Sequence, residues 1–170
     1  MARALNSSEN RTFRAARYAA LRSLRFTIDQ LNSGNATVAQ VWMGVQQPGN
    51  LHTLAQCLER IFAALQGIHQ GQINVEPNGH WFAEVHPNDP AHHITLGRDF
   101  FTTETYGNDS RAGTLIHETS HFNDVLGTHD HAYGQEACLR LVQQARQYDG
   151  NLQTVLSNAD NWEYLVENSY

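Results

Sequence analysis

Residues 114–121 have the sequence Thr-Leu-Ile-His-Glu-Thr-Ser-His, which contains the pattern His-Glu-x-x-His. On a helix this pattern places two imidazoles four residues apart on one face, with a carboxylate beside the gap between them. His117 and His121 therefore suit a tetrahedral zinc ion. Glu118 lies too far round the helix to bind that ion, but it can accept a proton from the water that the zinc activates. The stretch predicts a helix that carries a zinc site.

A catalytic zinc site needs a third protein ligand and one open position. Residues 127–134, Gly-Thr-His-Asp-His-Ala-Tyr-Gly, offer three candidates in a row: His129, Asp130 and His131. Zinc binds imidazole more generally than it binds the carboxylate of aspartate. If the segment is extended, neighbouring side chains point to opposite sides, so only one candidate can point at the metal. The residues alone leave this choice open.

The composition describes one globular domain. The chain has 170 residues, of which 41% are apolar and 16% charged, and no apolar run is long enough to span a membrane. A net charge of -6 gives no electrostatic case for a nucleic-acid partner. Residues 1–10 lack the apolar core of a secretory signal, so we expect that a leader has been removed or that export follows another route. We expect a monomer.

The chain contains no lysine and only two cysteines. All 11 basic residues are arginines, which either codon bias or a selected cause explains equally well at this point. Cys57 and Cys138 both fall in amphipathic helical patterns, where buried free thiols are the default, and the sequence does not decide whether they pair.

Hydrophobic periodicity predicts two helices before a region of strands. Residues 8–31 carry apolar side chains at three- and four-residue spacing, with Ser7 or Ser8 as the N-cap and arginines on a solvated face. Residues 51–66 repeat the pattern after a turn at residues 48–50, and residues 38–45 form a short buried segment between them.

The middle of the chain changes to period two. Residues 72–76, 81–85 and 92–97 alternate apolar and polar side chains and are separated by turn signals, which predicts a small antiparallel sheet. The histidines at 80, 86, 92 and 93 are expected at the surface.

Helical patterns return after residue 108. Capping residues at 108–110 start the helix that carries His117, a further helix is predicted at residues 135–148, and a turn at 149–151 precedes a last helical stretch at 158–167. We therefore predict an α+β fold over residues 1–170, with two N-terminal helices, a small sheet, the catalytic helix and C-terminal helices.

Two motifs together resemble a known family. Residues 113–122, followed by Gly127-Thr128-x-Asp130-x-x-Tyr133-Gly134, resemble the aspzincin metalloendopeptidases, which comprise the deuterolysins and the peptidyl-Lys metalloendopeptidases. The resemblance is strong over residues 110–134 and resumes at 158–164. It implies a zincin-like fold in which the strand at 94–96 is an edge that pairs with extended substrate. The disulfides of the fungal secreted members have no counterpart in these two cysteines.

The resemblance also implies the roles of the site residues. It makes Asp130, rather than His129 or His131, the third ligand of a single Zn²⁺ beside His117 and His121. It makes Glu118 the general base and directs the hydroxyl of Tyr133 at the developing oxyanion. Thr128 is then a candidate partner of Asp130.

The peptidyl-Lys branch suggests a specificity. In that branch an Asp and a Glu, matched here by Asp160 and Glu163, line the pocket for the residue after the scissile bond. Carboxylates at i and i+3 converge on one point, which suits the compact ammonium group of lysine. We therefore predict cleavage on the amino side of lysine, and the absence of lysine from this chain fits a protease that does not digest itself. The alternative is that Asp160 caps the last helix and Glu163 is solvated.

These expectations combine into a secreted or exported zinc metalloendopeptidase that acts on lysine-containing proteins or peptides. One alternative is a non-catalytic zinc-binding or interaction module. Glu118 separates the two, because a structural zinc site is normally closed by four protein ligands and needs no general base. Another alternative is the same protease chemistry deployed as a bacterial secretion-system effector.

Overall fold

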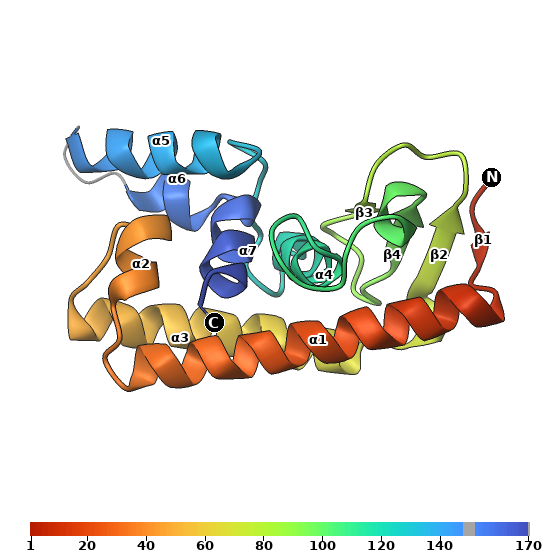
Figure 1. Ribbon diagram of the computed structural model, residues 1–170, viewed down its shortest axis with the longest axis horizontal. Helices are drawn as coiled ribbons and strands as arrows, with labels where there is room; N and C mark the ends of the chain where they lie inside the picture. Colours follow the sequence, from red (N-terminus) through yellow and green to blue (C-terminus); the bar gives the residue numbers. More distant parts are fainter. Residues whose placement is uncertain (148–151, 170) are drawn as a thin grey trace.

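The structure is a computed structural model that describes residues 1–147 and 152–169. The predicted end of a helix at Tyr148 and the predicted turn at residues 149–151 lie outside the described residues. The fold is α+β, as predicted, with the sheet at one end of an elongated molecule and most of the shorter helices at the other (Figure 1). The helices are α1 (Ser7–Asn32), α2 (Thr37–Trp42), α3 (Pro48–Gly67), α4 (Arg111–His121), α5 (Gln135–Gln147), α6 (Leu152–Leu156) and α7 (Ala159–Glu167). The strands are β1 (Arg3–Ala4), β2 (Ile73–Glu76), β3 (Ala83–Val85) and β4 (Ile94–Gly97).

The long helix α1 runs along α3, and together they form the base of the molecule (Figure 1). The predicted helix is confirmed, but its N-cap is Asn6 rather than Ser7 or Ser8. The Asn6 side chain accepts hydrogen bonds from the backbone of Ser8 and Glu9, and the Glu9 carboxylate accepts one from the Asn6 N–H at 2.8 Å. This reciprocal capping box satisfies more of the free N–H groups than a serine in the first turn can.

Two other helical expectations needed correction. The turn predicted at residues 48–50 is instead the first turn of α3, because Pro48 occupies a position where a helix needs no N–H donor. The short buried segment at 38–45 contains the additional helix α2, so three helices rather than two precede the sheet. Cys57 is half-buried and Cys138 buried, and both are free thiols.

The sheet is mixed, whereas the sequence predicted an antiparallel one. Its strand order is β1-β2-β4-β3, and β4 pairs in parallel with β2 and antiparallel with β3. The chain therefore passes from β2 to the far edge before it returns to the middle. Just before β3, the backbone carbonyl and ring of Trp81 lie against Gly97 at the end of β4, where a Cβ atom would collide with them.

This topology changes which strand lies at an edge of the sheet. The strand at residues 94–96 lies inside the sheet, so the prediction that it is an edge was wrong. The edge strands are β1 and β3, and β3 is the one that lies beside α4 (Figure 1). Ala83 and Val85 pair with Leu96 and Ile94 of the buried strand β4, and within the part of the chain that the structure describes no strand pairs with the other edge of β3.

Helix α4 lies at the centre of the molecule, between the sheet and α7 (Figure 1). Its predicted start is confirmed: the Ser110 hydroxyl accepts a hydrogen bond from the Gly113 N–H at 2.9 Å. Ala112, Leu115 and Ile116 are at most 2% exposed, and the polar face opposite them is also largely buried. Among the residues that the structure describes, no helix combines the length and the apolar character that a membrane span needs.

Candidate active site

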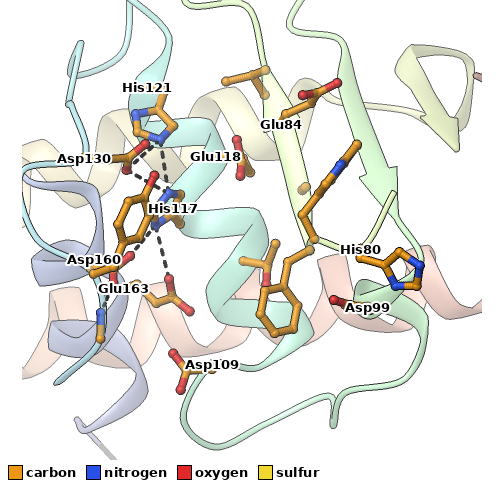
Figure 2. A pocket seen from close by; sticks show the side chains of 17 residues that line it. His80, Glu84, Asp99, Asp109, His117, Glu118, His121, Asp130, Asp160 and Glu163 are labelled. Atoms are coloured by element: carbon orange, nitrogen blue, oxygen red, sulfur yellow. Dashed lines mark hydrogen bonds and ion pairs between the residues drawn. The ribbon is translucent and has the colours of Figure 1, made fainter. Parts of the chain in front are cut away.

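The polar face of α4 forms one wall of a cavity of about 640 Å³. Thr114, His117, Glu118 and His121 project from this face at three- and four-residue spacing. The opposite wall comes from β3 and the segment before it, which includes His80 and Trp81. His80 is exposed, as the sequence predicted, and it also borders the cavity. Figure 2 shows the imidazoles and carboxylates converging from α4, α7 and the loop after α4.

Three donor atoms meet at one end of this cavity. Nε2 of His117 lies 3.1 Å from Nε2 of His121, and Oδ1 of Asp130 lies 3.2 and 3.3 Å from these two nitrogens. A tetrahedral zinc ion with bonds of about 2.0–2.1 Å requires ligand atoms about 3.3 Å apart. Two imidazole nitrogens this close cannot both carry a proton that points at the other, whereas a shared cation satisfies both. The donor set therefore fits Zn²⁺.

The other two candidates for the third ligand lie outside this group. The backbone of His129 forms a parallel β-bridge with Asn158, and Nε2 of His131 lies 2.9 Å from Oγ of Ser157. Asp130, between them in sequence, is the one whose side chain reaches both α4 histidines, as its dashed contacts in Figure 2 show.

Hydrogen bonds at the far side of each ring orient the two histidines. Nδ1 of His117 lies 2.7 Å from Oδ1 of Asp160, and Nδ1 of His121 lies 2.9 Å from the carbonyl oxygen of Thr128. Each contact fixes Nδ1 as the donor and leaves Nε2 free to bind a metal. Thr128 thus supports His121, whereas the sequence analysis assigned it to Asp130.

Glu118 lies in the cavity wall between His117 and β3 and is 6% exposed (Figure 2). Burial raises the pKa of its carboxyl group above the ordinary value, although the two neighbouring histidines oppose the shift. A carboxylate that faces the open side of a metal site without reaching the metal is placed as a general base requires.

Tyr133 borders the cavity. Its ring stacks against that of His117, with ring centroids 6.4 Å apart, and the residue is 66% exposed. Partial burial and a hydrogen bond to Asp130 raise its pKa to about 12. The phenol therefore remains protonated and can donate a hydrogen bond near the metal site.

Asp160 and Glu163 converge, as their spacing predicted, but the atom on which they converge is Nδ1 of His117. Oδ1 of Asp160 is 2.7 Å and Oε2 of Glu163 is 3.3 Å from it. Both side chains also line the cavity, so neither is solvated. Asp160 does not cap α7, because Asn158 occupies the N-cap position. The bond from Asp160 to His117 was not anticipated, since these residues are far apart in sequence.

Glu167 is a further buried carboxylate that the sequence analysis missed. It accepts hydrogen bonds from the N–H and hydroxyl groups of Ser110, at 2.9 and 2.7 Å. Burial raises its pKa to about 8, and burial likewise raises that of Glu163 to about 7. Glu167 follows Glu163 by four residues on the same helix, and this spacing was the sequence signal that could have placed the two carboxylates side by side.

The comparisons with known proteins agree with this geometry. A model of the aspzincin M35 family, described as lysine-specific metallo-endopeptidase, matches residues 29–167. The chain belongs to the aspzincin family. A solved structure of a zinc peptidase from Grifola frondosa superimposes on this aspzincin with a TM-score of 0.82 at 30% sequence identity, covering 96% of this chain and 97% of that one.

Two sequence relatives are much longer than this aspzincin. A peptidyl-Lys metalloendopeptidase of Armillaria mellea is 32% identical over 165 residues, which are 96% of this chain and 45% of that protein. An extracellular protease of Aeromonas hydrophila is 44% identical over 89 residues, which are 52% of this chain and 24% of that protein. The chain thus spans less than half the length of these curated relatives.

Gly113 is required where α4 passes beneath the acidic side chains of α7. A Cβ atom there would collide with Oε1 of Glu167 and lie 2.5 Å from Oε1 of Glu163. Because their hydrogen bonds hold these carboxylates, we expect Gly113→Ala to lower the free energy of unfolding by about 1–3 kcal/mol. The matched control is Gly49→Ala in α3, where no atom lies within 4 Å of the new methyl group. Chemical denaturation measures both, and equal stability of the two variants would show that the carboxylates move freely.

Proposed function

We propose that this aspzincin is a zinc metalloendopeptidase domain that hydrolyses peptide bonds in proteins or peptides. The observation that carries the proposal is the position of Glu118. It lies beside the His117–His121–Asp130 group, in the wall of a cavity bordered by the free edge of β3. The experiment that tests the proposal is digestion of a denatured protein mixture, with and without a chelator, with the new peptide termini identified by mass spectrometry.

His117, His121 and Asp130 would hold the ion. When bound, zinc supplies a Lewis acid that lowers the pKa of a water molecule toward neutrality and polarises the scissile carbonyl group. Glu118 accepts the proton of the attacking water and passes it to the leaving amine. The hydroxyl of Tyr133 donates a hydrogen bond to the oxyanion.

The free edge of β3 gives the substrate a place to bind. An extended peptide can add to an exposed strand by main-chain hydrogen bonds, which hold it in one register without depending on its sequence. Ala83, Glu84 and Val85 all border the cavity that contains Glu118, so a peptide paired with β3 crosses the metal site.

A non-catalytic zinc module is less consistent with this geometry. A structural zinc ion is normally enclosed by four protein ligands. Here the Asp130 side chain is 31% exposed and the group opens into a large cavity, which leaves room for a water molecule and a substrate. A buried carboxylate such as Glu118 costs stability and serves no purpose in a closed structural site.

We propose further that the enzyme cleaves on the amino side of lysine. Asp160 and Glu163 border the cavity next to His117, with Glu167 behind them. Such a group of buried carboxylates is costly until a cation joins it, and the ammonium group of lysine supplies that charge. The absence of lysine from the chain supports this proposal. The relatives named peptidyl-Lys metalloendopeptidase support it too.

Peptides that differ only in the residue after the bond, as Lys, Arg, Ala or Leu, test this specificity. We expect kcat/KM for lysine to exceed that for leucine by about 10²-fold or more, because leucine leaves the carboxylates unpaired. Glu163→Gln should lower this ratio by at least about 10-fold while largely preserving kcat. Asp160→Asn should instead lower kcat for every peptide, because it also disturbs His117. Equal rates for Lys and Leu peptides in the wild type would refute the assignment.

We propose that the protein is a monomer that is exported from the cell. The extracellular protease among its relatives supports export. The relatives give no support to delivery as a secretion-system effector.

A further inference from the structure

We propose that Asn158 is a positioning residue that sets the places of Asp130 and Tyr133 relative to the α4 histidines. This inference rests on the proposed function and concerns the loop that would supply both the third metal ligand and the oxyanion donor. Asn158 touches neither the metal group nor the substrate cavity. It acts through the two residues that separate Asp130 from Tyr133.

The side chain of Asn158 forms hydrogen bonds to the backbone of both residues between Asp130 and Tyr133. Oδ1 of Asn158 accepts hydrogen bonds from the N–H groups of His131 and Ala132, at 2.8 and 2.9 Å. Nδ2 of Asn158 donates to the carbonyl oxygen of Ala132 at 3.1 Å. The backbone between Asp130 and Tyr133 is thus bound on its donor and acceptor sides by the same amide group.

The contacts require an amide. Nδ2 of Asn158 also donates to Oδ1 of Asn161 at 2.8 Å, and Asn161 in turn donates to the carbonyl oxygen of Trp42 at 2.6 Å. Both asparagines are 0% exposed, so water cannot replace a lost bond without entering the core. A carboxylate at position 158 would turn an oxygen toward two acceptor oxygens.

The loop that carries Asp130 is also attached by backbone hydrogen bonds at His129, which are independent of the Asn158 side chain. The backbone of His129 bonds to that of Ser157 and Ala159, at 2.7 and 3.0 Å, and these bonds do not involve the Asn158 side chain. Removal of that side chain therefore leaves the loop attached at residue 129. It frees the peptides at 131 and 132, which lie between Asp130 and Tyr133, and it also removes a contact of Nδ2 with Sγ of Cys138 at 3.4 Å.

The test compares Asn158→Ala with Asn161→Ala. Both changes remove a fully buried amide from the same network, but the amide of Asn161 bonds to Asn158 and to Trp42 rather than to the loop. Three quantities are measured for the zinc-loaded proteins: the rate of zinc release to a chelating dye, the absorption spectrum after cobalt substitution, and the unfolding free energy.

We expect Asn158→Ala to release zinc about 10- to 100-fold faster, which is the factor by which loss of a partner that orients a metal ligand lowers metal affinity, and to alter the cobalt spectrum. Asn161→Ala should release zinc within about threefold of the wild-type rate, with an unchanged spectrum, although it too loses stability. Equal release rates for the two variants, or wild-type release from Asn158→Ala, would overturn the inference.

A second variant covers the case in which Asn158→Ala does not fold. Asn158→Asp keeps the acceptor for His131 and Ala132 but loses the donor to the Ala132 carbonyl, and we expect zinc release at least about fivefold faster than in the wild type. Unchanged release from this variant also contradicts the inference. Zinc release needs no substrate, so a wild-type protein that binds zinc but cleaves nothing contradicts the proposed function and leaves this test intact.

Discussion

Glu118→Gln is expected to lower kcat by several orders of magnitude while zinc content and thermal stability stay at the wild-type level. Glutamine has the shape of glutamate and fits the same buried position, but it cannot accept the proton of the attacking water. Because Glu118 does not belong to the group of side chains proposed to hold the ion, its replacement should leave zinc bound. The effect should fall on kcat and kcat/KM alike, as for an interaction made mainly in the transition state.

Glu84→Gln is the matched control, since Glu84 is a second glutamate in the wall of the same cavity, on β3. We expect its kcat to remain within a few-fold of the wild-type value. Steady-state kinetics on one lysine-containing peptide measures both variants, and metal analysis confirms that each is loaded. A Glu118→Gln enzyme with near-normal turnover would show that another group accepts the proton.

Asp130→Ala is expected to abolish stable zinc binding. It removes one of the three side chains proposed to hold the ion, so the loss of affinity should exceed the roughly 10- to 100-fold that follows from losing a group that only orients a ligand. His129→Ala and His131→Ala are controls on either side of it, and both should retain zinc because neither side chain belongs to the group of donor atoms. Metal analysis after dialysis decides between them. Full zinc in Asp130→Ala, with loss in either histidine variant, would reassign the third ligand.

The sequence predicted the parts of the site that depend on local spacing. The helix at residues 111–121 follows from its cap at Ser110 and its periodicity, and the helix alone brings His117 and His121 together. The choice of Asp130 over its histidine neighbours came from the family motif, because an irregular loop gives no periodicity from which to deduce direction.

Contacts between distant segments could not be predicted in this way. The parallel pairing of β2 with β4 joins two strands that are not consecutive in the chain, which no alternation of polar and apolar residues reveals. The bond between His117 and Asp160 and the burial of Glu167 against Ser110 depend on how α7 packs across α4. The same packing places Asn158 beneath the loop that carries Asp130.

The two oxygens of Asp160 have a consequence for efforts to redirect the cleavage preference by directed evolution. One oxygen holds His117 and the other accepts a hydrogen bond from the Gly134 N–H at 2.7 Å, directly after Tyr133. A library randomised at Asp160 therefore selects for two properties at once, and most of its members will be inactive before a new preference can be detected. A library that keeps Asp160 fixed and varies Glu163 together with Thr114 explores the same wall of the cavity, while it retains the shorter of the two carboxylate contacts to His117 and the bond to Gly134.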